Sequence, residues 1–147
     1  MNPTAPRPAA VVDRRAGAQW PIAGLFLDAL VHRDFIALAS CLHPDVRFRA
    51  LVPPGPFDTT GAAETVSRFQ RWFGGDDEFE VVDASIGQVG ARIYLRWLVR
   101  MRSARNSDSG RLVEQHAFAT AGERIESLDL LCSGFQMESA ASHCSVT

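Results

Sequence analysis

The stretch 92-RIYLRWLVRMR-102 alternates apolar and polar side chains more regularly than any other part of this 147-residue chain. A repeat of two residues is that of a β-strand, so we expect a strand here with one covered face. The covered set is Ile93, Leu95, Trp97, Val99 and Met101. The opposite set is Arg92, Tyr94, Arg96, Arg100 and Arg102, with Leu98 as its one apolar member.

Other strands and helices are expected on both sides of this segment. Strands are predicted over about 46–51, 79–89, 112–120 and 124–133, the last two joined by a turn at Ala121-Gly122. Helices are predicted over about 22–32, 35–41 and 62–73, with Asp34 and Thr60 as N-caps of the second and third. The stretch Pro53-Pro54-Gly55-Pro56 predicts a stiff turn or an extended loop. Because helices and sheets bury their apolar faces against each other, we expect the helices to pack on one face of a curved antiparallel sheet. This arrangement is an α+β domain.

Length and composition indicate how the domain is organised and which classes of partner are excluded. We expect a tail over 1–18, one domain over 19–138 and a second tail over 139–147. The formal net charge of −2 provides no basic field for nucleic acid. No apolar run reaches the roughly 18–20 residues of a membrane span, and no signal peptide is expected. All 15 basic residues are arginines, so Schiff-base and P-loop lysine chemistry are excluded.

Three cysteines, Cys41, Cys132 and Cys144, have no disulfide or metal-ligand spacing. We therefore expect free thiols in a cytoplasmic protein that has no metal and no cofactor. Cys132 is a candidate nucleophile, but an inert buried cysteine is the commoner case.

The order of these elements and several local motifs resemble the nuclear transport factor 2-like superfamily, in particular its SnoaL-like, polyketide cyclase-like branch. The resemblance covers about 20–136. It rests on the helices over 26–35, the step Leu42-His43-Pro44-Asp45-Val46-Arg47-Phe48, the helix over 61–73, the strand over 92–97, and the closing hairpin with Glu114-Gln115-His116, Gly122 and Ile125. The resemblance implies a conical sheet around an apolar cavity closed by the helices, and it implies a homodimer.

The closing hairpin supplies the candidate catalytic pair. If Thr120 pairs with Glu123, His116 faces Ser127 and Asp129 faces Glu114. The alternation then places one set on a single face, although which hairpin face lines the cavity stays open. That set is His116, Phe118, Ile125, Ser127, Asp129 and Leu131.

Titratable groups in an apolar cavity have shifted pKa values and can act as acids or bases. The SnoaL-like resemblance implies Asp129 as the base that takes a proton from carbon and His116 as the donor to the enolate. The alternative is a hydrogen-bonded sheet histidine and a solvated aspartate. Pocket walls are expected from Phe26, Phe48, Leu95, Trp97, Phe118, Ser127 and Leu131.

Two functions follow from these expectations. The first is a cofactor-independent enzyme that cyclises, isomerises or dehydrates a hydrophobic carbonyl or polyketide-like compound. The second is a non-catalytic ligand-binding or accessory domain of the same fold. No carboxylate stands near Ala50, where the steroid-isomerase relatives have their catalytic aspartate, so a close ketosteroid isomerase is excluded.

Overall fold

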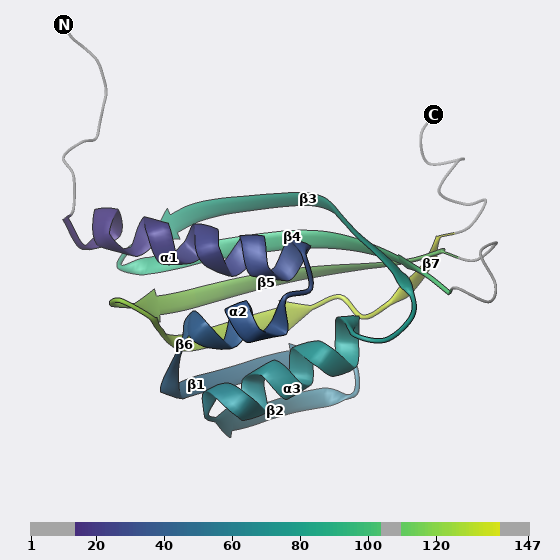
Figure 1. Ribbon diagram of the computed structural model, residues 1–147, viewed down its shortest axis with the longest axis horizontal. Helices are drawn as coiled ribbons and strands as arrows, with labels where there is room; N and C mark the ends of the chain where they lie inside the picture. Colours follow the sequence, from purple (N-terminus) through teal and green to yellow (C-terminus); the bar gives the residue numbers. More distant parts are fainter. Residues whose placement is uncertain (1–13, 104–109, 139–147) are drawn as a thin grey trace, which may run out of the picture.

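The computed structural model describes residues 14–103 and 110–138, with side chains from 21 onward. Three helices lie over one face of a seven-stranded sheet (Figure 1). The helices are α1 Arg14–Val31, α2 Phe35–Ser40 and α3 Ala62–Phe73. The strands are β1 Leu42–Val52, β2 Gly55–Thr60, β3 Glu78–Val89, β4 Arg92–Arg102, β5 Gly110–Ala121, β6 Ile125–Cys132 and β7 Gln136–Glu138. This is the predicted α+β class. No helix within the described ranges is long and apolar enough to cross a membrane.

The strand order is β2-β1-β6-β5-β4-β3, and β7 pairs with β5. All pairs are antiparallel except β1 with β6, which run parallel. The sheet is therefore mixed rather than wholly antiparallel as predicted. The difference arises because α3 and four strands separate β1 from β6, so the chain returns beside β1 in the same direction.

Several boundaries agree with the sequence, and others differ for local reasons. The Asp34 side chain accepts a hydrogen bond from the Ala37 backbone N–H at 3.0 Å, as expected of an N-cap. Thr60 instead ends β2, and Gly61 is the N-cap of α3 without a side-chain bond. The sequence does not predict β2, because Pro56 argues against a strand, but the structure places β2 at the edge of the sheet, where proline is tolerated. Helix α1 begins at Arg14, inside the predicted tail, while residues 1–13, 104–109 and 139–147 lie outside the described residues.

Aromatic rings occupy much of the space between the helices and the sheet. Phe26 of α1, Phe69 of α3, Phe48 of β1 and Trp97 of β4 have fully buried side chains. Four pairs of these rings are in contact. The centroid distances are 5.8 Å for Phe26–Trp97 and for Phe48–Phe69, 5.9 Å for Phe26–Phe69 and 6.2 Å for Phe69–Trp97. The predicted alternation of β4 is confirmed, with Trp97 and its apolar set on the helix side. The two faces of the sheet are therefore chemically different: an apolar inner face under the helices, and an outer face that carries both charged and apolar side chains.

Candidate functional site

One fully buried amide stands on the otherwise apolar inner face of the central strands. Gln115 is 0% exposed, and its Oε1 accepts a hydrogen bond from Trp97 Nε1 at 2.7 Å. Its Nε2 donates to Cys132 Sγ at 3.3 Å. The three residues face one another across β4, β5 and β6 in direct register. A buried amide needs its partners, so this row fixes the position of the Cys132 thiol.

The thiol lies in the wall of a pocket of about 570 Å³, which we call the end pocket because β1 and β6 end there. The pocket is lined by Val52, Pro53, Pro54, Arg68, Trp72, Cys132, Ser133, Gly134, Phe135 and Gln136. The Gly134 backbone N–H also donates to Cys132 Sγ, at 3.4 Å. Because the sulfur accepts two N–H groups, its own S–H hydrogen remains available for a ligand.

The rim of the end pocket depends on a glycine. Gly134 has φ +80°, a conformation that side chains rarely adopt. A Cβ at this position would lie 2.6 Å from Pro53 Cγ. The turn after β6 can therefore close against the β1–β2 turn only because residue 134 has no side chain.

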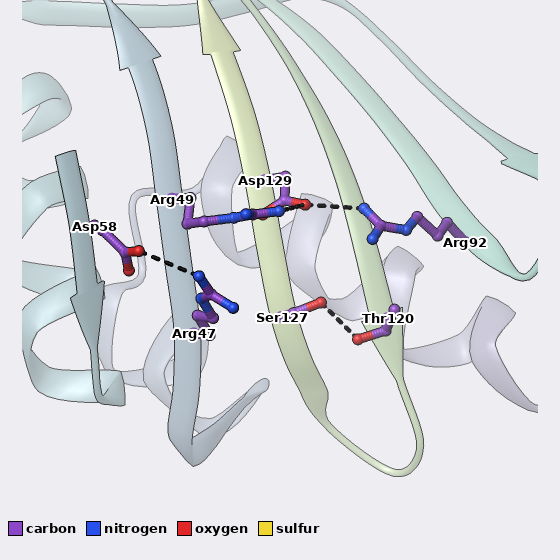
Figure 2. A network of polar contacts seen from close by, with 7 residues as sticks. All are labelled: Arg47, Arg49, Asp58, Arg92, Thr120, Ser127 and Asp129. Atoms are coloured by element: carbon purple, nitrogen blue, oxygen red, sulfur yellow. Dashed lines mark hydrogen bonds and ion pairs between the residues drawn. The ribbon is translucent and has the colours of Figure 1, made fainter. Parts of the chain in front are cut away.

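The outer face carries a second, more open hollow of about 730 Å³, which we call the outer groove. It is lined by Arg49, Ala50, Leu51, Pro56, Phe57, Asp58, Arg92, Phe118, Asp129, Leu130 and Leu131. Figure 2 shows the charged row across its floor, in which Asp129 of β6 lies between Arg49 of β1 and Arg92 of β4.

Asp129 is held by three charge-assisted hydrogen bonds. Arg49 Nε donates to Oδ1 at 2.8 Å, and Arg49 Nη2 donates to Oδ2 at 2.7 Å. Arg92 Nη1 reaches over β5 and donates to Oδ2 at 2.9 Å. The hydrogen bonds from Arg49 lower the pKa of Asp129 below its usual range, and Arg92 adds to this despite the opposing effect of burial. Asp129 is therefore a carboxylate at neutral pH.

The lowered pKa predicts a pH-dependent contribution to stability. An unfolded aspartate has a pKa of about 3.9. The stabilisation is complete above that value and is lost as the pH falls through the lower folded pKa. We expect Asp129→Asn to lower the free energy of unfolding by about 1 kcal/mol at pH 7, since solvent screens these partly exposed pairs. Urea unfolding should show this difference vanishing towards pH 2.

The control for this prediction is Glu123→Gln, an exposed carboxylate in the β5–β6 turn for which the described residues include no ion-pair partner. It should leave the unfolding midpoint unchanged at both pH values. A constant difference between Asp129→Asn and wild type from pH 7 to pH 2 would contradict an ionic role for Asp129.

His116 lies on the same outer face, with both ring nitrogens in contact with neighbours. Tyr94 Oη is 2.6 Å from Nδ1, and Glu114 Oε2 is 3.2 Å from Nε2. Glu114 also accepts from Arg96 Nε at 2.6 Å, which is the main reason that its pKa is lowered. His116 thus belongs to a polar row along β4 and β5.

The structure confirms that His116, Phe118, Ser127, Asp129 and Leu131 share a face, but the predicted strand register is wrong. His116 pairs with Leu131 and Phe118 with Asp129. A bulge between Thr120 and Ala121 changes which residues pair across the hairpin, but these five residues still share one face of the sheet. The same bulge turns Ile125 inward, where it is fully buried, contrary to its predicted place beside His116.

The predicted site residues divide between the two faces. Phe48, Leu95 and Trp97 are buried on the inner face, and Phe26 of α1 is buried against Trp97. Of the other predicted residues, Phe118, Asp129 and Leu131 line the outer groove, while Ser127 pairs with Thr120 at 2.6 Å. None of the nine lines the end pocket.

Sequence reasoning missed Gln115 as a functional residue and gave Cys132 only a minor role. The sequence contains a signal for them, because the alternation in the hairpin places Gln115 and Cys132 on one face among apolar neighbours. Across 14–103 and 110–138, no group of three or more His, Cys, Asp or Glu side chains could hold a metal ion.

Comparisons with known proteins agree on the fold. A family model described as SnoaL-like domain matches residues 24–128. A search of curated proteins finds no match to the chain. The solved structures that match include a candidate polyketide cyclase from Xanthomonas campestris pv. campestris, with 18% identity, 80% of this chain and 90% of that chain covered, and a TM-score of 0.62.

Two further structures show the range of proteins that share this fold. An NTF2-like protein of unknown function from Mesorhizobium loti has 19% identity, with 83% and 96% of the two chains covered and a TM-score of 0.61. An LEH-like epoxide hydrolase from M. tuberculosis has 16% identity, 80% and 84% coverage and a TM-score of 0.58. Identities this low support the fold alone, but the family model spans most of the chain. The chain therefore belongs to the SnoaL-like domain family and has the NTF2-like fold.

Proposed function

We propose that this chain is a small-molecule-binding domain whose end pocket holds a hydrophobic carbonyl compound without turning it over. The observation that carries the proposal is the Cys132 thiol, which two N–H donors fix in the wall of an otherwise largely apolar pocket. The candidate polyketide cyclase of the same fold supports a polyketide-like ligand. A homodimer and a cytoplasmic location stay predictions.

The walls of the end pocket suit a flat apolar compound with one oxygen. Trp72 and Phe135 supply aromatic surface, and Pro53 and Val52 supply aliphatic surface. Arg68, whose Cζ lies 4.0 Å from the centre of the Phe57 ring, provides N–H donors for a carbonyl oxygen. The Cys132 S–H is a second, weaker donor. Apolar walls with a few polar groups are typical of ligand pockets of this size.

The same lining argues for binding rather than acid–base catalysis. Among the described residues, no histidine, aspartate or glutamate lines the end pocket. His116 and Asp129 lie on the opposite face of the sheet, where their polar atoms contact neighbouring side chains. A carboxylate with a lowered pKa is also a weak base for removing a proton from carbon. Proton transfer by this pair would have to take place on the outer face.

A matched pair of aromatic probes tests the binding proposal. We expect isothermal titration calorimetry to show that 2-acetylnaphthalene binds at least about fivefold more tightly than 2-ethylnaphthalene, because only the ketone accepts hydrogen bonds. Phe135→Ala should weaken both probes by at least about fivefold, since it removes an aromatic wall. Met137→Ala is the matched control, being exposed nearby but outside the lining. Equal affinities for Phe135→Ala and wild type would contradict the proposal.

Hydrogen exchange on the bound ketone separates the two functions. In D₂O, a catalyst that forms an enolate replaces the methyl protons of 2-acetylnaphthalene with deuterium, which proton NMR detects. We expect the protein to leave this rate at its buffer value. Accelerated exchange that is lost in both Asp129→Asn and His116→Ala would instead establish the acid–base function.

A further inference from the structure

The end pocket is lined by a single charged side chain among the described residues, that of Arg68 on α3. No other arginine and no histidine, aspartate or glutamate of the described ranges takes part in this lining. The lining therefore has one excess positive charge. The outer groove differs in this respect, because its Arg49 and Arg92 are balanced by Asp58 and Asp129.

The Arg68 guanidinium has no anionic partner within the part of the chain that the structure describes. Arg96 and Arg100, by contrast, each contact two carboxylates. The contact that Arg68 does make is with the ring of Phe57, whose centre lies 4.0 Å from Cζ. A contact over a ring face holds the group in place without giving it an oxygen acceptor. Arginine has five N–H donors, so those of Arg68 stay available to an acceptor in the pocket.

A half-buried charge beside apolar walls favours an anion over a neutral ligand. Arg68 is half-buried, and burial strengthens its attraction to an opposite charge because less water screens the pair. The planar guanidinium can donate two parallel hydrogen bonds to the two oxygens of a carboxylate, whereas a ketone offers one uncharged oxygen. The same charge repels a cation.

Contacts outside the end pocket hold its aromatic walls. Phe135 packs edge-on against Phe73, with ring centroids 6.4 Å apart, and Arg111 Cζ lies 5.0 Å from the centre of the Phe135 ring. Trp72 packs edge-on against Phe69, with ring centroids 5.3 Å apart. Because side chains held in this way need little further ordering on binding, these walls suit a rigid, flat ring system.

We propose that the end pocket selects an aromatic carboxylate and that Arg68 is the residue that determines this specificity. The carboxylate lies at the Arg68 guanidinium, and the ring system lies against Trp72 and Phe135. A pocket of about 570 Å³ is large enough for two fused rings. This specificity rests on the function proposed above and narrows its ligand class, because the carbonyl group of the ligand is then that of a carboxylate rather than that of a ketone or an amide.

Three naphthalenes of nearly equal size test the charge of the ligand by isothermal titration calorimetry at neutral pH. We expect 2-naphthoate to bind at least about fivefold more tightly than its neutral isostere 2-naphthamide, and 2-naphthylmethylammonium to bind more weakly than 2-naphthamide. Raising NaCl from about 50 to about 500 mM should weaken the binding of 2-naphthoate and leave that of 2-naphthamide unchanged. These comparisons use the wild-type protein, so they do not depend on the folding of any variant.

The Arg68→Gln variant assigns the charge to its residue. It should lower the affinity for 2-naphthoate at least about fivefold and leave that for 2-ethylnaphthalene unchanged, because glutamine has neither the charge nor the paired donors of a guanidinium. Glutamine is a good helix former, so α3 should stay intact. Arg71→Gln on the same helix is the charge-matched control, because Arg71 is exposed and outside the lining, and it should change neither affinity.

Equal affinities for 2-naphthoate and 2-naphthamide would overturn the carboxylate specificity, and so would an Arg68→Gln variant that binds 2-naphthoate as wild type does. In both cases the function proposed for the end pocket would stand if Phe135→Ala still weakened the binding of 2-acetylnaphthalene. If Phe135→Ala left the binding of 2-acetylnaphthalene unchanged, that function would fail, and the carboxylate specificity would fail with it.

Discussion

Replacing Trp97 by alanine should lower the free energy of unfolding by about 3–5 kcal/mol, the range for removing a fully buried large aromatic side chain. Trp97 is 0% exposed, and its ring packs between Phe26 and Phe69, at centroid distances of 5.8 Å and 6.2 Å. The substitution leaves a cavity at the centre of the inner face and removes the donor to Gln115. Urea unfolding followed by far-ultraviolet circular dichroism measures the loss.

A loss of this size approaches the whole stability of a small domain, so a milder variant accompanies the test. Trp97→Phe keeps an aromatic ring and loses the indole N–H, and it should cost about 1–3 kcal/mol because the Gln115 oxygen is left without its donor. Ile36→Ala on α2, where the side chain is 84% exposed, is the control and should stay within about 0.5 kcal/mol of wild type. A Trp97→Ala variant that loses under 1 kcal/mol would show that the aromatic cluster is not the core.

The fold was largely predictable because its signals are local. Alternation identifies β4 from its own residues, and apolar spacing with a glycine stop identifies α3 at its observed bounds. The β2 strand and the parallel β1–β6 pair were not predictable in the same way. Both depend on which strand ends beside which, and contacts between distant segments decide that.

The candidate site was less predictable, for a reason that Asp129 illustrates. Alternation shows which residues share its face, but not whether the helices cover that face. The arginines that hold Asp129 are 80 and 37 residues away along the chain, on strands whose neighbours are set by the whole sheet. Gln115 shows the converse. Its sequence neighbours place it on the apolar face, yet its partners Trp97 and Cys132 come from two other strands.

Replacing Gln115 by leucine is the second substitution that we expect to lower the free energy of unfolding strongly. Gln115→Leu keeps a similar volume but leaves the Trp97 indole N–H with no acceptor in a fully buried site. An unsatisfied buried donor costs about 1–3 kcal/mol, and we expect the free energy of unfolding to fall by that amount in urea titrations. Gln70→Leu, an exposed glutamine on α3, is the matched control and should change stability by under about 0.5 kcal/mol.

Combining Gln115→Leu with Trp97→Phe tests the physical cause rather than the size of the loss. Each single variant leaves one buried partner unsatisfied, whereas the double variant removes both and leaves only apolar groups. When both partners become apolar the penalty largely disappears, so the double variant should be more stable than the sum of the single losses predicts, by at least about 1 kcal/mol. Strict additivity would mean that the two side chains stabilise the domain independently, by packing alone. The row from Trp97 to Cys132 would then have no part in fixing the thiol at the pocket wall.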